Sequence, residues 1–381
     1  MKKILFVVES LSGGGAEKVL LTLIKNLDKS KYNITVFSIV KTGVYAKKIE
    51  KNCNVIYGLK EYSDYYNFFG KLYYKIKMKM IYGINTKIIY RWLIKGKYDI
   101  EIGFVEGFAT KFVAASNNKM SKKITWVHID MITRPYTDKY YRNLNDQINT
   151  YKNYNQIICV SNDVKKQFEN KFKISTNVTV LYNPIDNNVN VYKKEYVLLE
   201  NDIVFCTVGR LEYQKGYDRL IKAVSKLKKN KFFFRLNIIG EGSQRKRLEM
   251  LIEKYNLQEY IKLYGFLPNP YEIMSQSDIF ICSSRSEGFS LVIAEAMILG
   301  IPIMTTNCAG PYELIEGGKY GLLCENNTNS LIDNMQYILN NKNRMHSLNC
   351  SILFLLLFKS VLITPVSWRY SINIFKCSGK M

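Results

Sequence analysis

Acidic residues are scarce in this 381-residue chain, which carries 32 Asp and Glu residues against 55 Lys and Arg residues. The resulting formal net charge of +23 indicates an anionic partner, such as nucleic acid, an anionic membrane surface or a phosphorylated substrate. Histidine is rarer still, and no H-E-x-x-H or D-x-D spacing occurs in the sequence. Because these metal-ligand patterns are missing, we expect a metal-independent protein that needs no cofactor.

Long hydrophobic runs and paired cysteines are also missing. No run reaches the ~20 apolar residues of a membrane span, and the eight cysteines include no C-x-x-C pair. Several cysteines lie within apolar segments, which is typical of reduced core residues in a cytosolic protein. The amino-terminal MKKILFVVES has a basic start, but polar and acidic residues soon follow its apolar run. We therefore expect a first core strand there and not a signal peptide.

The first half of the chain alternates strand-like and helix-like segments. Apolar runs predict strands that are buried on both faces of a parallel sheet, and they cover residues 4–8, 34–40, 100–105, 124–128 and 156–161. The first run leads through a glycine-rich turn, 12–15, into a helix predicted over 16–27. This turn lacks the G-x-G-x-x-G pattern of dinucleotide-binding proteins. The alternation predicts a doubly wound α/β domain that meets its ligands at the carboxyl ends of the strands.

The alternation restarts after a polar stretch, 183–200, which we predict to be an interdomain linker. Further strands are expected at 203–208, 232–239, 261–265, 279–282 and 301–305, with helices between them. We therefore expect one Rossmann-like domain over 1–185 and a second over 186–345. The tail, 346–381, is atypical because no acidic residue follows Asp333 and its apolar run is short and interrupted. We interpret this tail as a frameshifted or degenerate end, with a membrane-touching hairpin as the alternative.

The stretch 283–300 carries the strongest local signal for a ligand site. An apolar strand runs into a polar turn and then into a helix whose apolar face is predicted to consist of Leu291, Ala294, Met297 and Ile298. Glu287 lies in the turn, and Glu295 follows about two helical turns later. The backbone amides of 288–290 would face an anion at the positive helix end. Two carboxylates that flank a diphosphate suit a nucleotide sugar. A capped surface helix with two solvated glutamates fits the spacing equally well.

Three further residues are candidates for the same chemistry. Arg210 and Lys215 lie on the first strand-to-helix turn of the second domain and could neutralise a diphosphate without a metal. Their alternative is a pair of solvated loop cations. His128 ends a predicted strand within WVHID, at the edge of the sheet where ligands bind. A purely structural histidine is the alternative there.

The segment 65–98 combines basic and aromatic residues and contains no acidic residue. Its cations and rings are interleaved along predicted helix, as expected of a helix that lies on an anionic lipid surface. A solvated basic helix is the alternative. Nucleic acid is a third interpretation, but no recognised fold or repeat supports it, so we expect no nucleic-acid partner.

Taken together, these motifs resemble one family, the retaining glycosyltransferases of group 1 (family 4) with the GT-B fold. The matching stretches are GGGAEKV (13–19), WVHID (126–130), VGRLEYQKGYDRLIKA (208–223), IIGEG (238–242), YGFLPN (264–269) and SEGFSLVIAEAM (286–297). The resemblance implies two Rossmann-like domains that face each other across a cleft. It also implies transfer of a hexose or N-acetylhexosamine from a nucleotide-diphosphate sugar, usually a UDP-sugar, with retention at the anomeric carbon.

The resemblance also implies a role for each matching residue. Glu295 would bind the ribose hydroxyls and Glu287 the transferred sugar, while Arg210 and Lys215 would bind the diphosphate. His128 would contact the donor sugar. The remaining donor-site positions are glycines and amides near the phosphates, namely Gly14, Gly15, Gly288, Phe289 and Ser290. Asp130 is a weaker candidate near the acceptor hydroxyl.

Within this family the sequence looks most like bacterial enzymes of capsule, O-antigen (lipopolysaccharide) or glycoprotein-oligosaccharide assembly. Their acceptor is a glycan on polyprenyl diphosphate, so we expect a cytoplasmic enzyme that is peripheral at the inner face of the plasma membrane. Family members usually end in a helix that crosses back onto the first domain, and the acid-free tail does not resemble it. Compromised activity is therefore expected if the tail is altered. The alternatives are a GT-B-fold UDP-sugar epimerase and an inactive membrane-associated partner of glycan assembly.

Overall fold

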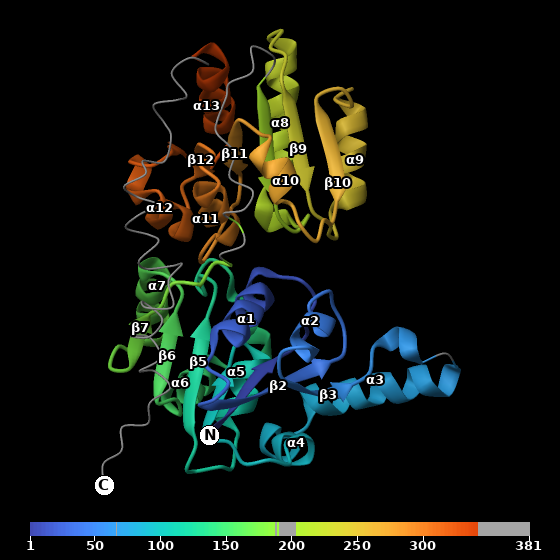
Figure 1. Ribbon diagram of the computed structural model, residues 1–381, viewed down its shortest axis with the longest axis vertical. Helices are drawn as coiled ribbons and strands as arrows, with labels where there is room; N and C mark the ends of the chain where they lie inside the picture. The colour runs from blue at the N-terminus through green and yellow to red at the C-terminus, as the bar shows by residue number, and fades with distance from the viewer. Residues whose placement is uncertain (66, 187–188, 190–202, 342–381) are drawn as a thin grey trace. The chain divides into compact units, whose positions relative to one another are not determined.

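The computed structural model describes residues 1–65, 67–186, 189 and 203–341. The described residues form two compact units, one from Met1 to Pro184 and the other from Ile185 onward, and Figure 1 shows a parallel sheet with helices in each of them. The predicted tail, 346–381, and most of the predicted linker lie outside the described residues.

The first unit is built on a seven-stranded parallel sheet in the order β3-β2-β1-β4-β5-β6-β7. Its strands are β1 (Lys2–Val8), β2 (Tyr32–Val40), β3 (Asn54–Leu59), β4 (Ile100–Gly103), β5 (Lys122–Val127), β6 (Gln156–Cys159) and β7 (Val178–Val180). Its helices are α1 (Gly15–Asn26), α2 (Ala46–Glu50), α3 (Phe68–Gly83), α4 (Thr86–Leu93), α5 (Phe108–Ala114), α6 (Leu144–Lys152) and α7 (Asn162–Phe172). The strand order reverses between β1 and β4, which makes that point the expected ligand edge of the sheet.

The second unit repeats this design with a six-stranded parallel sheet in the order β10-β9-β8-β11-β12-β13. Its strands are β8 (Val204–Val208), β9 (Arg235–Ile239), β10 (Ile261–Gly265), β11 (Ile279–Cys282), β12 (Ile303–Thr306) and β13 (Leu322–Cys324). Its helices are α8 (Tyr217–Lys229), α9 (Arg245–Lys254), α10 (Tyr271–Ser275), α11 (Leu291–Ile298), α12 (Ala309–Leu314) and α13 (Thr328–Asn340). Here the order reverses between β8 and β11.

The central strands are buried because helices cover both faces of each sheet. In β1 the side chains from Ile4 to Val7 are all 0% exposed, and every residue of β11 is buried. Such strands need unbroken apolar runs, and these were the runs that predicted the parallel sheets. The predicted fold class, two doubly wound Rossmann-like α/β domains, is confirmed.

Helix α11 differs from its prediction. We expected one apolar face, but every residue from Ile293 to Ile298 is buried, Glu295 included. The four residues of the predicted face are buried as expected, but burial extends around the helix because β11, β12 and α12 all contact it. A helix that is buried all round carries apolar residues at every angle and gives no amphipathic signal.

Candidate donor-binding site

The site is built from two loops of the second unit that meet where its strand order reverses. One loop follows β8 and ends in a short 3-10 turn (Tyr213–Lys215), and the other connects β11 to α11. Gly216 lies between that turn and α8 with a positive φ of 69°. A Cβ atom there would lie 2.1 Å from the carbonyl oxygen of Ser283. Only glycine therefore lets the two loops approach this closely.

Backbone and side-chain hydrogen bonds join the two loops. The Arg285 amide donates to the Gln214 carbonyl at 2.7 Å, and the Ser283 hydroxyl donates to the Lys215 carbonyl at 2.8 Å. The Gln214 side-chain amide donates in return to the Ser286 carbonyl at 2.5 Å. These bonds fix the backbone positions of the residues that were predicted to hold the diphosphate and the sugar.

Arg285 strengthens this connection from outside the predicted set. Its guanidinium donates to both carboxylate oxygens of Asp218, each at 2.8 Å, and lies 3.8 Å from the centre of the Tyr213 ring. A planar fork of this kind holds a carboxylate in one orientation. Hydrogen bonding to Asp218 raises the pKa of Arg285, so the guanidinium stays charged and holds Tyr213 in place.

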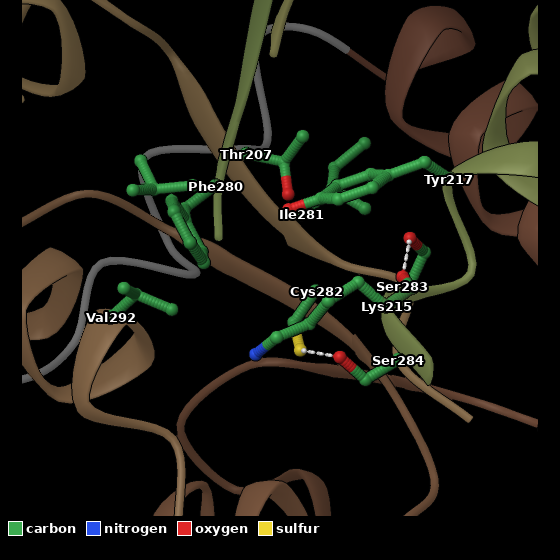
Figure 2. A pocket seen from close by; sticks show the side chains of 10 residues that line it. Thr207, Lys215, Tyr217, Phe280, Ile281, Cys282, Ser283, Ser284 and Val292 are labelled. Atoms are coloured by element: carbon green, nitrogen blue, oxygen red, sulfur yellow. Dashed lines mark hydrogen bonds between the residues drawn. The ribbon is translucent and has the colours of Figure 1, made fainter. Parts of the chain in front are cut away.

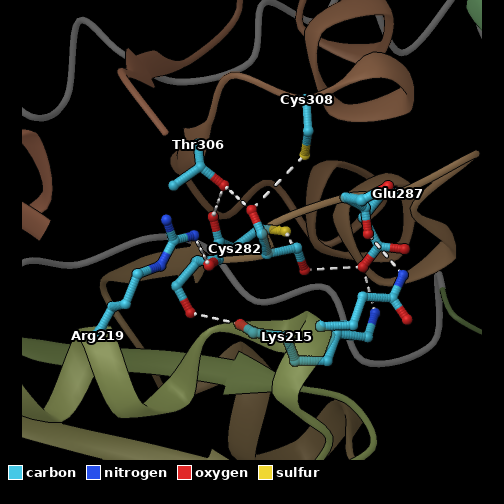
Figure 3. A network of polar contacts seen from close by, with 10 residues as sticks. Lys215, Arg219, Cys282, Glu287, Thr306 and Cys308 are labelled. Atoms are coloured by element: carbon cyan, nitrogen blue, oxygen red, sulfur yellow. Dashed lines mark hydrogen bonds and ion pairs between the residues drawn. The ribbon is translucent and has the colours of Figure 1, made fainter. Parts of the chain in front are cut away.

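Lys215 and Glu287 form the central ion pair of the site (Figure 3). Their side chains are 18% and 9% exposed, and Glu287 also accepts a hydrogen bond of 2.8 Å from the Ser284 hydroxyl. Burial by itself would lower the pKa of Lys215, but the charge of Glu287 and the hydrogen bond to it outweigh burial, and the pKa is raised. The lysine is therefore cationic throughout the physiological pH range.

A small cavity lies beside this pair, at the carboxyl ends of β8 and β11 (Figure 2). Its lining residues are Thr207, Val208, Lys215, Tyr217, Phe280, Ile281, Cys282, Ser283, Ser284 and Val292. The cavity volume is about 10 Å³, which is near the lower limit of the space that one water molecule needs. A nucleotide sugar therefore does not fit inside this cavity.

The remaining predicted residues of this unit surround the pair. Arg210 is exposed on the loop after β8, and its charge acts on Lys215. Ser290 is the N-cap of α11 and is 2% exposed, and its hydroxyl has no hydrogen-bond partner among the described residues. A buried hydroxyl without a partner at a helix N-terminus is well placed to donate to an anion. The structure thus brings Lys215, Glu287 and the turn 288–290 together.

Glu295 lies on α11, two turns beyond the N-terminus of the helix, and is 1% exposed. Glu287 is buried as well. The alternative of two solvated glutamates on a surface helix is therefore wrong. A buried carboxylate costs free energy unless it is paired or hydrogen-bonded, which Glu287 is.

The candidates of the first unit lie at the carboxyl edge of its own sheet. Gly14 is the N-cap of α1 and Gly15 is its first residue, whereas the positive φ of this turn belongs to Gly13. His128 directly follows β5, and its Nε2 lies 2.9 Å from the Phe104 carbonyl oxygen. Burial lowers the pKa of His128, so the neutral ring donates from Nε2 and keeps Nδ1 as an acceptor. Asp130 accepts hydrogen bonds from the backbone amides of 132 and 133.

Two carboxylates at this edge were not predicted. Glu106 is 4% exposed and accepts from the His128 amide at 2.9 Å and from the Tyr136 hydroxyl at 2.8 Å. Glu9 accepts from the hydroxyls of Tyr82 and Tyr140 at 3.0 and 3.1 Å. Both glutamates come just after strands. Because ligands bind at the carboxyl ends of parallel strands, that position in the sequence could have identified them as candidates.

Two family models match consecutive parts of the chain. The model described as Glycosyltransferase Family 4 covers residues 13–189, and the model described as Glycosyl transferases group 1 covers residues 188–350. The chain is a group 1 glycosyltransferase. This glycosyltransferase is 28% identical over 349 residues to an uncharacterized glycosyltransferase of Haemophilus influenzae, covering 90% of this chain and 91% of that protein.

Two further comparisons extend the likeness. Identity is 27% over 349 residues to the N-acetylgalactosamine-N,N'-diacetylbacillosaminyl-diphospho-undecaprenol 4-alpha-N-acetylgalactosaminyltransferase of Campylobacter jejuni, covering 89% of this chain and 90% of that protein. Among solved structures, Anabaena HepE in complex with UDP and glucose superposes with a TM-score of 0.76 at 19% identity, covering 98% of this glycosyltransferase and 99% of HepE. At that identity the superposition shows the fold, which is GT-B.

The described part of the chain contains neither a candidate membrane span nor a candidate metal site. No described helix is long and apolar enough to cross a bilayer, and the described residues contain no group of three or more His, Cys, Asp or Glu side chains that could hold a metal ion.

Proposed function

We propose that this glycosyltransferase moves a hexose or N-acetylhexosamine from a UDP-sugar, with retention, onto a glycan carried by polyprenyl diphosphate. The observation that carries the proposal is the arrangement around α11. A partly buried lysine, a buried carboxylate and a buried serine hydroxyl without a partner converge at the N-terminus of one helix. This combination suits a diphosphate attached to a sugar, because the phosphates need positive charge and the sugar needs hydrogen-bond acceptors.

In this proposal the cations and the helix end bind the leaving group. Lys215 and Arg210 neutralise the charge that develops on the diphosphate as the glycosidic bond breaks, and the hydroxyl of Ser290 donates to a phosphate oxygen. The carboxylates bind hydroxyls: Glu287 accepts from the transferred sugar and Glu295 from the ribose. The chemistry needs no metal, because the protein supplies the positive charge itself.

The first unit supplies the acceptor side in this proposal. In it Gly14 and Gly15 leave space for substrate at the carboxyl edge of the first sheet, and His128 accepts a sugar hydroxyl at its Nδ1. The relative from Campylobacter jejuni is named for transfer to a saccharide on diphospho-undecaprenol, which supports a lipid-linked acceptor. We further propose that segment 65–98 holds the enzyme at the inner face of the plasma membrane.

The division of roles between the two carboxylates is tested by Glu287→Ala and Glu295→Ala, with Glu272→Ala, an exposed residue on α10, as the matched control. Glu295→Ala should weaken UDP binding by about 1–3 kcal/mol through the loss of its hydrogen bonds to ribose. Glu287→Ala should retain UDP binding and lose sugar transfer. Calorimetry measures binding, and transfer to a polyprenyl-diphosphate-linked saccharide measures activity. Equal loss of UDP binding in both variants would contradict the assignment.

Product analysis separates this function from its alternatives. A retained anomeric configuration on the added sugar, read by NMR, supports retaining transfer, whereas inversion would contradict it. An epimerase would instead convert the UDP-sugar with no acceptor present. A protein that binds UDP but neither transfers nor epimerises would be an inactive partner of glycan assembly, as expected if the tail has impaired the enzyme.

A further inference from the structure

Helix α3 exposes an unusual amount of apolar surface for a helix of a globular unit. Nearly half of the exposed large hydrophobic side chains of the described residues lie between 62 and 92. On α3 itself Phe68 and Phe69 are 74% and 77% exposed, and only Ile81 is fully buried among its residues. Figure 1 shows α3 running outward from the edge of the sheet at β3. A core helix would hide these side chains, so this surface indicates an interaction site.

The exposed apolar side chains share one side of the helix. At about 100° per residue they fall within a stripe of roughly 140°, and they are Phe68, Phe69, Leu72, Tyr73, Ile76 and Met80. We call this set the outer stripe. The opposite side faces the protein: Tyr74 packs against Tyr62 and Tyr65 with ring centroids 5.1 and 5.6 Å apart, and Ile81 is buried. The outer stripe is therefore not a poorly packed core face.

Lysines border the outer stripe on both sides. Lys75 and Lys79 project from one border of the stripe and Lys77 from the other, as the helical period of 3.6 residues places them. Lys77 also lies 5.2 Å from the Tyr73 ring centre and 5.1 Å from that of Trp92 on α4. No acidic residue occurs between Asp64 and Asp99. An apolar stripe bordered only by cations complements anionic lipid, whose head groups pair with lysines while its acyl chains accept the rings.

The last turn of α3 attaches this helix firmly to the ligand edge of the first sheet. The Tyr82 hydroxyl donates to Glu9, the first residue after β1, at 3.0 Å. The Tyr82 ring also lies 4.4 Å from the ring centre of Phe108. Glu9 precedes the glycine turn that we assign to the substrate side. A lipid surface in contact with α3 would therefore lie at a fixed distance from that turn.

We propose that α3 is a docking helix whose outer stripe inserts into the interface of an anionic lipid bilayer, with Lys75, Lys77 and Lys79 on the lipid head groups. This inference deepens the proposed function, because it assigns the membrane contact to one face of one helix. It requires no transfer activity, so lipid binding tests it separately.

The test is flotation of the intact chain with vesicles of phosphatidylcholine and phosphatidylglycerol. The double variant Phe68→Ser/Phe69→Ser should lose at least about tenfold in partitioning, because two large rings no longer leave water. The matched control is Met250→Ser on α9, a side chain that is 62% exposed in the other unit, and it should partition like the wild type. Lys75→Gln/Lys79→Gln should lose roughly 25-fold, since each cation near an anionic surface contributes about fivefold.

Insertion depth distinguishes docking from simple charge attraction. Phe69→Trp should be quenched by lipids brominated on their acyl chains, because the docked ring reaches below the head groups. UDP binding of every variant is measured in parallel. A variant that loses vesicle binding but retains UDP binding shows that docking and donor binding are separate. A variant that loses both is misfolded. In that case the quenching of Phe69→Trp decides whether α3 inserts into the bilayer.

Three outcomes would overturn the proposal. The first is partitioning of Phe68→Ser/Phe69→Ser equal to that of the wild type. The second is an unquenched tryptophan at position 69 in vesicle-bound protein. The third is a dimer in solution that the Phe68→Ser/Phe69→Ser variant dissociates and that vesicles fail to compete with, because the stripe would then be a contact between two copies of the chain.

Discussion

Replacing Lys215 by methionine should destabilise the second unit, because Glu287 would keep a buried charge without its partner. Both side chains are less than one-fifth exposed. Removal of one member of a buried ion pair costs about 3–5 kcal/mol, and the partial exposure of Lys215 places the loss near the lower end. For a unit of this size, a loss of about 3 kcal/mol lowers the Tm by roughly 6–12 °C.

The double variant Lys215→Met/Glu287→Gln isolates the ion pair from the rest of the effect. The neutral amide removes the buried charge and can still accept the hydrogen bond from Ser284, so the double variant should recover more than half of the lost Tm. Calorimetric scans of the full chain measure these shifts, and Lys222→Met, an exposed lysine of α8, is the matched control. A loss below about 2 °C in Lys215→Met, or a double variant no more stable than the single one, would contradict a stabilising ion pair between Lys215 and Glu287.

Three further predictions concern both units. Burial raises the pKa of Glu9 above its ordinary value of 4.5, so the folded state holds this proton more tightly than the unfolded state does. The stability of the wild type therefore falls as the pH rises above 4.5. Because glutamine does not titrate, the Tm of Glu9→Gln should increase relative to that of the wild type between pH 4.5 and 7.5. A constant difference across that range would contradict this. Gly216→Ala should lower the free energy of unfolding by at least about 1–3 kcal/mol, as measured by urea unfolding, because its Cβ would collide with the Ser283 carbonyl oxygen. A variant as stable as the wild type would contradict the close approach of the two loops. Asp218→Asn should lower kcat/KM for the donor, by an amount equivalent to about 1.5–3 kcal/mol of transition-state free energy. The substitution weakens the two hydrogen bonds from Arg285 that hold the loop of Tyr213. Unchanged donor kinetics would contradict this positioning role.

The central strands could be predicted from the sequence because burial on both faces demands unbroken apolar runs. The runs at 4–8 and 279–282 lie within the central strands β1 and β11. The strands β3, β7 and β13 were not predicted. All three lie at or near the sheet edges, and the last two span only Val178–Val180 and Leu322–Cys324, which is too short for a periodic signal.

The candidate site could be predicted only as a set of residue types at the ends of strands. Arg210, Lys215 and Glu287 were named correctly as neighbours of the strand ends, because parallel strands bring those ends to one edge. Their partners could not be derived. The ion pair of Lys215 with Glu287 depends on how closely the two loops pack at Gly216. The paired hydrogen bonds from Arg285 to Asp218 depend on the rotation of α8 about its axis. Contacts between loops distant in the sequence leave no periodic pattern in a single chain.

Calorimetric titration of the whole chain with UDP, GDP and ADP, beside Glu295→Ala, decides whether the second unit holds a UDP-sugar site. We expect selective binding of UDP that the substitution weakens by about 1–3 kcal/mol. Absence of binding for all three nucleotides, or equal affinity for them that Glu295→Ala leaves unchanged, would contradict a UDP-sugar site at the loops after β8 and β11.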